Sequence, residues 1–115
     1  MPAQYARLLR PAGPCCSVFV TGEVILCGGI VTTDAFNGIA WCVLSKHAAP
    51  HLLALHRAVT RFLGMQRLRR IEASVLSGFA PGIRWVELLG FEHEGSMRGY
   101  GPAGETYERY AKVNI

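Results

Sequence analysis

The sequence predicts a single α/β domain (of the α+β kind), in which helices flank a mixed central β-sheet. Three observations predict this class: β-rich runs alternate with two helical segments, a strand–helix–strand unit lies at the centre, and half of the residues are hydrophobic. A crossover helix returns the chain in its original direction, so the two strands of the central unit should be parallel. A chain of 115 residues suits one domain with one core. We expect the order β-β-β-α-β-α-β-β over residues 15–115.

The first part of the chain is expected to be an arm followed by three strands. Residues 1–14 are broken by prolines and a glycine and are expected to form an N-terminal arm. The β-rich runs 17–20 and 24–31 flank a short turn and predict a hairpin. Gly28 and Gly29 inside the second run indicate a bulge or a close backbone approach. Asn37-Gly38 is expected to end the next turn, so the third strand should run from Ile39 to Leu44.

Two helices and three strands are expected after residue 50. Pro50 suits the first turn of a helix, and Gly64 suits its end. The apolar stripe of this helix is expected to be Leu52, Leu55, Val59 and Phe62, with Leu53 and Leu63 beside it. Residues 70–76 alternate in polarity and predict a strand. Residues 79–89 predict a second helix, and residues 91–99 and 105–113 predict the last two strands.

Four stretches of the second half form a series that carries a family resemblance. They are residues 70–75 (RIEASV), 83–91 (IRWVELLGF), 94–100 (EGSMRGY) and 106–110 (TYERY). The most specific part is the helix that ends in Leu89-Gly90-Phe91, followed by Glu94-Gly95 and an aromatic strand. The series resembles the C-terminal half of a domain of the GNAT superfamily of N-acetyltransferases. The resemblance extends over residues 17–113 and implies a shortened GNAT-like (acyl-CoA N-acyltransferase) fold, without the usual first strand and first helices.

Within that superfamily, the chain is most similar to small GNAT-like proteins of phages and prophages, whose central strand resembles residues 40–45 (AWCVLS). Some members of that group are virion or assembly proteins. The resemblance therefore implies a catalytically degenerate protein associated with the virion or its assembly. Such a protein would lie in the host cytoplasm or in the phage particle, and would act through protein partners or as a homo-oligomer. The alternative is an acetyl-CoA-dependent N-acetyltransferase that acts on an amine of a small molecule or a protein.

Two features of the family's enzymes are missing from this sequence. In those enzymes, glycines in the loop after the central strand bring backbone amides close to the CoA pyrophosphate. The equivalent residues 45–51 (SKHAAPH) contain no glycine, and Pro50 has no amide hydrogen to donate. The family also often places a tyrosine, as general acid, five residues before the Phe of the Gly-Phe pair. That position is Val86 here, and Trp85 lies beside it.

The resemblance still implies a place for acetyl-CoA and for one catalytic group. A splayed pair of strands, residues 41–45 and 70–76, would leave backbone groups free to bind a pantetheine arm. The candidate cofactor-binding residues are Val43, Leu44, Ser45, Lys46 and His47, of which Lys46 and His47 could offer positive charge to phosphates. Glu72 is the catalytic candidate, because a glutamate on this strand can act through water as a general base for the amine.

The cysteines, histidines and arginines of the sequence suggest three further kinds of site. Zinc could use the four cysteines (Cys15, Cys16, Cys27 and Cys42) and the histidines, but no C-x2-C pair is present, so we expect reduced thiols and no metal. A Cys–His nucleophilic pair is a second alternative, although cysteines in apolar runs are usually inert. Arginines between residues 57 and 70 could contact a phosphate backbone or an acidic partner. No aromatic residue is interleaved with them, so we do not expect a nucleic-acid partner.

The bulk properties exclude a membrane protein. The net charge of +4 is only mildly basic and by itself indicates no particular partner. No apolar run approaches the length of about 18 residues that a spanning helix needs. The N-terminal residues also lack the apolar core of a signal peptide. We therefore expect a cytoplasmic protein without membrane association.

Overall fold

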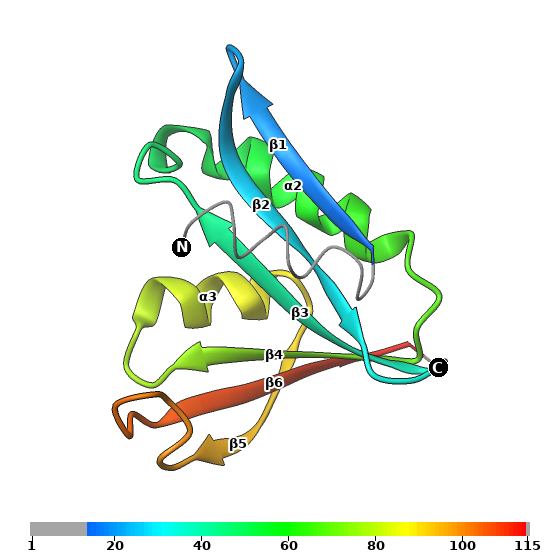
Figure 1. Ribbon diagram of the computed structural model, residues 1–115, viewed down its shortest axis with the longest axis vertical. Helices are drawn as coiled ribbons and strands as arrows, with labels where there is room; N and C mark the ends of the chain where they lie inside the picture. The colour runs from blue at the N-terminus through cyan, green and yellow to red at the C-terminus, as the bar shows by residue number, and fades with distance from the viewer. Residues whose placement is uncertain (1–13, 115) are drawn as a thin grey trace.

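The computed structural model describes residues 14–114, and its elements follow the order expected from the sequence (Figure 1). These elements are β1 (Cys15–Val20), β2 (Glu23–Thr32), β3 (Asn37–Leu44), the 3-10 turn η2 (Ala49–His51), α2 (Leu52–Gly64), β4 (Arg70–Leu76), α3 (Ala80–Leu88), β5 (Glu92–Met97) and β6 (Tyr107–Val113). The expected N-terminal arm lies outside the described residues, apart from Pro14. The carbonyl of Pro14 accepts a hydrogen bond from the amide of Ile30 at 2.9 Å.

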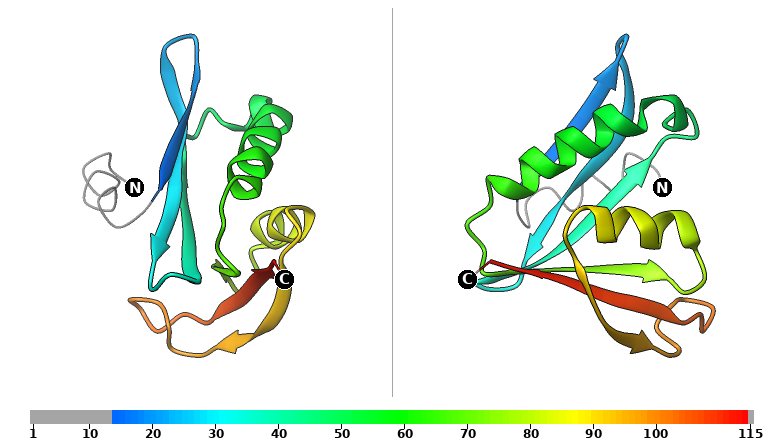
Figure 2. Two further views of the ribbon diagram at one scale, coloured as in Figure 1. Left: turned by 90° about the vertical axis from the view of Figure 1, so that its right-hand side faces the viewer. Right: turned by 180° about the vertical axis from the view of Figure 1, so that it is seen from behind.

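The sheet is mixed, as the sequence predicts. Its six described strands follow the order β1-β2-β3-β4-β6-β5. β3 and β4 are parallel, and every other neighbouring pair is antiparallel. Helices α2 and α3 both lie on one face of the sheet (Figure 2). This arrangement agrees with the expected α/β fold; α3 packs on β4, and α2 packs on β1 and β2.

The third strand begins earlier than expected, because a side chain closes the preceding turn. We expected Asn37-Gly38 to end that turn, but both residues belong to β3. The carboxylate of Asp34 accepts hydrogen bonds from the amides of Phe36 (2.7 Å) and Asn37 (2.9 Å), and from the side chain of Asn37 (2.8 Å). These bonds, the side-chain bond first, hold the pKa of Asp34 below its ordinary value. The turn is therefore complete before Asn37.

The glycine pair in β2 marks a close backbone approach and no bulge. Pairing of β2 with β1 and β3 continues without a break through Gly28 and Gly29. A Cβ atom on Gly28 would lie only 2.9 Å from the backbone oxygen of Trp41 on the next strand. Any side chain at this position would therefore push β2 and β3 apart.

Helix α2 begins later than expected, and it ends at Gly64, as the sequence predicts. Pro50 lies in the short turn η2, and α2 begins two residues later at Leu52. Leu55 and Leu63 are buried, whereas Leu52 is exposed. The expected stripe is therefore wrong at Leu52, where the helix extends beyond the core.

No helix among residues 14–114 has the length and apolar character needed to cross a bilayer.

The core consists of two clusters that meet under α2. The larger cluster joins both helices to the sheet through Ile30, Leu63, Ile71, Val86, Phe91 and Tyr110. The smaller cluster packs the start of α2 on β2 through Ile25, Leu26, Ala48 and Leu55. Val59 packs against both clusters. Helix α2 therefore belongs to both clusters: Leu63 lies in the larger one and Leu55 in the smaller one.

Candidate functional site

The two parallel strands at the centre of the sheet separate after a short paired segment. β3 and β4 pair at only three positions, which join Asn37 to Arg70, Gly38 to Ile71 and Ile39 to Glu72. β3 continues to Leu44 against β2, and β4 continues to Leu76 against β6. The strands diverge in a V between these partners (Figure 1). The expected splay is therefore confirmed, and it leaves one edge of β3 without a strand partner among the described residues.

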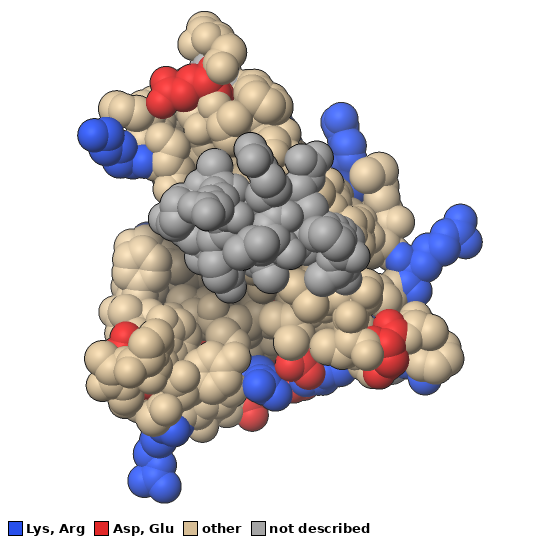
Figure 3. Space-filling view, in the orientation of Figure 1, with Lys and Arg blue, Asp and Glu red and all other residues tan. Residues whose placement is uncertain are grey.

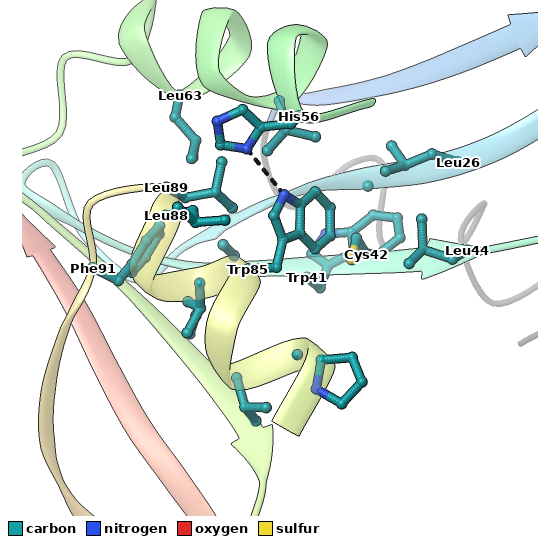
Figure 4. Close-up of a pocket in the computed structure, with 18 of the residues that line it drawn as sticks. Leu26, Trp41, Cys42, Leu44, His56, Leu63, Trp85, Leu88, Leu89 and Phe91 are labelled. Atoms are coloured by element: carbon teal, nitrogen blue, oxygen red, sulfur yellow. Dashed lines mark hydrogen bonds between the residues drawn. The ribbon is translucent and has the colours of Figure 1, made fainter. Parts of the chain in front are cut away.

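A large apolar pocket opens at this splay, between α2 and α3. It has a volume of about 880 Å³ and is lined by side chains from both helices and from β2, β3 and β4 (Figure 4). Ser74, His56 and Arg84 are among the few polar residues of the lining, and none of the lining residues is an Asp or a Glu. The pocket therefore suits a ligand with an uncharged, extended body.

A hydrogen bond joins the two helices across the pocket. Trp85 on α3 donates from Nε1 to Nδ1 of His56 on α2, at 3.2 Å (Figure 4). This arrangement requires that Nδ1 of His56 carry no proton. The two residues are 29 positions apart in the chain. The periodicity of either helix gives no sign of such a pair, so the sequence does not predict it.

Two thiols face the pocket from neighbouring positions on the sheet. Cys16 on β1 and Cys42 on β3 are both paired with Gly28 on β2, so they flank a position that has no side chain. Cys42 is solvent-accessible, yet protein atoms surround it on most sides, as befits a residue in a concave wall. Burial, and then the neighbouring Cys16, raises the pKa of the Cys42 thiol. Burial likewise raises the pKa of Cys16. Both thiols therefore keep their protons at neutral pH.

Residues 45–51 form the loop at the open end of the splay, and most of their backbone amides already donate hydrogen bonds within the protein. Four of its amides donate to protein acceptors: Ser45 to the carbonyl of Ile25 (2.9 Å), His47 to the hydroxyl of Ser45 (3.1 Å), Ala48 to the carbonyl of Ser45 (3.0 Å) and His51 to the carbonyl of Ala48 (2.9 Å). Pro50 has no amide hydrogen. Leu44 lines the pocket, whereas Val43 points to the opposite face of β3 by strand alternation. The candidates Ser45, Lys46 and His47 lie in the loop itself.

Glu72 lies at the last paired position of β3 and β4, next to the splay. Its neighbours Ile71 and Ala73 pack against the helix-side core, so alternation directs Glu72 to the other face. Its carboxylate oxygens contact Arg70 Nε at 3.0 Å and Arg109 Nη1 at 3.4 Å. Arg70 also binds Glu94, and this hydrogen bond holds the pKa of Glu94 below its ordinary value. The candidate base is therefore fixed in an ion-pair network.

The remaining sequence candidates are dispersed. Within residues 14–114, no group of three or more His, Cys, Asp or Glu residues is close enough together to hold a metal ion. Of the arginines, Arg70 is held by carboxylates, and Arg69 lies over the ring of Phe36 at 4.8 Å. On the face shown in Figure 3, Lys and Arg side chains project singly from the rim and form no continuous stripe. Tyr110 is buried in the core, and burial raises its pKa.

Comparisons with known proteins rest on structure alone. No protein-family model matches the sequence, and no curated protein matches it. Ard1 from Thermoplasma volcanium superposes with a TM-score of 0.79 at 12% identity, over 98% of this chain and 78% of that one. The ribosomal-protein-S18-alanine N-acetyltransferase from Escherichia coli superposes with a TM-score of 0.77 at 15% identity, over 96% and 75% of the two chains.

A mutant of the spermidine N-acetyltransferase SpeG from Vibrio cholerae gives a TM-score of 0.74 at 12% identity, over 96% of this chain and 71% of that one. At such identities the likeness concerns only the path of the backbone. Acetyltransferases that act on quite different acceptors share this path. The chain spans about three quarters of the length of these proteins. Its strand order, its splayed central pair and these superpositions agree on one conclusion: the chain has the GNAT acetyltransferase fold.

Proposed function

We propose that this domain is a GNAT-type acyltransferase that binds an acyl thioester in the cleft between β3 and β4 and transfers the acyl group to an amine. The observation that carries the proposal is the early end of β3–β4 pairing at Ile39 and Glu72, with a pocket of about 880 Å³ opening beyond it. Ligand pockets commonly have volumes of about 300–1,000 Å³. The volume of this pocket therefore suits a ligand of the size of an acylated pantetheine.

The edge of β3 is suited to an extended ligand that contains amide groups. A pantetheine arm carries two such groups, and it could pair with the exposed backbone of β3 as an added strand does. The apolar side chains of α2 and α3 would cover its methylene groups on the other side. The thioester would then lie toward the narrow end of the V, and the phosphate end toward residues 45–51.

The transfer itself needs a base on the amine and a proton for the leaving thiolate. The amine nitrogen attacks the thioester carbonyl, the C–N bond forms, and the C–S bond breaks. Glu72, on the face opposite the helices, could take the amine proton through a water molecule, with Arg70 and Arg109 holding its carboxylate in place. Val86 is buried where the family's acid often lies. Since general acids contribute roughly 10²–10⁴ in rate, we expect slow turnover.

Calorimetry and a product assay test the proposal together. Acetyl-CoA and acetyl-pantetheine are titrated into the protein, and acetylated product is measured by mass spectrometry with spermidine and with peptides that contain alanine as acceptors. The acceptors follow from the names of the structural relatives. We expect binding of both thioesters, and loss of turnover without loss of binding in Glu72→Gln. If neither acetyl-CoA nor acetyl-pantetheine produced any binding heat, the proposal would be contradicted.

The non-catalytic role in a virion or its assembly, which the sequence resemblance implies, stays a prediction. None of the structural relatives named above is described as a virion protein. That role requires no thioester binding, and it predicts co-purification with other particle proteins or self-association. The same titration therefore distinguishes the two functions, because only the acyltransferase needs an occupied cleft.

A further inference from the structure

The open end of the cleft offers few donors for the phosphates of coenzyme A. Beyond its pantetheine arm, coenzyme A continues into a pyrophosphate and a phosphorylated adenosine, and backbone amides at a helix N-terminus commonly bind such groups. Four amides of residues 45–51 already donate within the protein, and Pro50 has none. A pantetheine arm that ends in a single phosphodiester would need fewer donors from this loop.

Two cations lie in the pocket lining or in the loop beside it. Arg84 lines the pocket from α3, and Lys46 lies in the loop between Leu44 and Leu52, which both line the pocket. The ion pairs among the described residues include neither Arg84 nor Lys46. No carboxylate lies among the lining residues to neutralise them. These two cations are therefore available to an anionic partner at the mouth.

Large apolar side chains surround the same mouth and extend outward from it. Four residues of the pocket lining are more than half exposed: Leu52 (57%), Leu53 (64%), Phe79 (52%) and Leu88 (68%). A ligand inside the cleft would leave the outer surfaces of these side chains in water. Exposed apolar patches with a charged rim are typical of protein interaction sites. Apolar residues combined with unpaired cations favour a protein that has an acidic surface.

We propose that the acyl donor is the thioester of a phosphopantetheine arm carried by an acidic carrier protein, and not acyl-CoA. This inference rests on the proposed function, and it names the donor for the same cleft. The arm enters the cleft, its single phosphodiester lies at residues 45–51, and the acidic surface of the carrier contacts Arg84, Lys46 and the apolar rim. The acyl carbon exchanges its C–S bond for a C–N bond, and the arm leaves as a free thiol that carries one proton.

The test compares three acetyl donors: acetyl-CoA, acetyl-4′-phosphopantetheine and an acetylated holo acyl carrier protein, with the apo carrier as the control for the arm. We expect the loaded carrier to bind at least about tenfold more tightly than acetyl-CoA, and the two small donors to agree within about threefold. Tenfold or greater preference for acetyl-CoA over acetyl-phosphopantetheine would overturn the carrier inference and leave the proposed function standing. Failure of all three donors to bind would overturn both.

Two variants and a matched control locate the carrier surface. Arg84→Glu reverses a charge at the mouth, and Leu53→Asp alters the apolar rim. Arg67→Glu makes the same charge change outside the pocket, in the segment between α2 and β4. We expect either mouth variant to weaken carrier binding by about tenfold, and Arg67→Glu to stay within about twofold of the parent protein. Equal losses of carrier binding in all three variants, or unchanged carrier binding in each of the two mouth variants, would overturn the proposed docking surface. Melting curves verify that each variant is folded.

Discussion

At the scale of single residues, Cys42 combines access to the pocket with an environment that keeps it protonated. Burial and Cys16 raise its pKa above the ordinary value of 9.0. The fold holds this proton more tightly than the unfolded chain does. The resulting stabilisation is therefore present below about pH 9 and is lost as the pH rises through the raised pKa.

This environment predicts the pH dependence of Cys42 alkylation. Only the thiolate reacts with iodoacetamide, so the reaction should be slow at pH 7 and should accelerate above pH 9. Peptide mass spectrometry follows the modification of Cys42, and Cys42→Ala controls for the other thiols. An acyl thioester in the cleft should protect Cys42. Reaction at pH 7 as fast as in the urea-unfolded chain would contradict this account of the site.

Trp85 and His56 give a second prediction at the scale of residues. Trp85→Phe removes the indole donor but keeps an aromatic ring against the pocket, so the stability change should reflect mainly the lost bond and the smaller ring. A hydrogen bond of this kind contributes about 0.5–1.5 kcal/mol. We expect a loss of about 1 kcal/mol in the free energy of unfolding, measured in urea. Unchanged stability would show that the bond is not formed in solution.

At the scale of elements, two of the three leucines near the start of α2 have different roles. Leu55 is fully buried in the smaller core cluster, whereas Leu52 is 57% exposed at the pocket mouth. Leu55→Ala should lower the free energy of unfolding by about 2–5 kcal/mol, because it removes buried methyl groups and leaves a cavity. Leu52→Ala should change it by less than about 0.5 kcal/mol. Similar losses from the two variants would mean that α2 has a different rotation on the sheet.

Two glycines test the packing of elements in opposite directions. Gly28 lies where a Cβ atom would come within 2.9 Å of the backbone oxygen of Trp41, so Gly28→Ala should cost about 1–3 kcal/mol of stability. Gly64 ends α2 and has no heavy atom within 4 Å of an added Cβ. Gly64→Ala should therefore raise stability by about 0.5–1 kcal/mol, through helix propensity. If thermal or urea unfolding showed Gly28→Ala to be as stable as the parent protein, the register of β2 and β3 would be contradicted.

At the scale of the whole molecule, local patterns predicted the elements better than they predicted the site. Alternating polarity gave the bounds of β4, from Arg70 to Leu76, as the structure has them. The start of β3 was misassigned because the carboxylate of Asp34 closes the turn, and this side-chain bond has no periodic signature. The strand–helix–strand order predicted the parallel pair. The splay was expected only from the family resemblance, since no pattern in either strand indicates where pairing stops.

The cleft arises from contacts between segments that are distant in the sequence. The Trp85–His56 bond joins residues 29 positions apart, and Cys16 meets Cys42 only through the register of three strands. The missing glycines in residues 45–51 were visible in the sequence. The hydrogen bonds that four amides of this loop donate within the protein were not visible, because those bonds depend on the turn that the chain adopts there.

The most direct test is an NMR titration of the labelled protein with acetyl-pantetheine, which contains neither nucleotide nor carrier. The titration maps the chemical-shift changes of the backbone amides and of the indole N–H groups. The account predicts the largest shifts at residues 40–44 of β3, at residues 73–76 of β4 and at the indole N–H of Trp85, with small shifts at residues 45–51. Shifts confined to the opposite sheet face around Glu94, or no shifts at all, would contradict it.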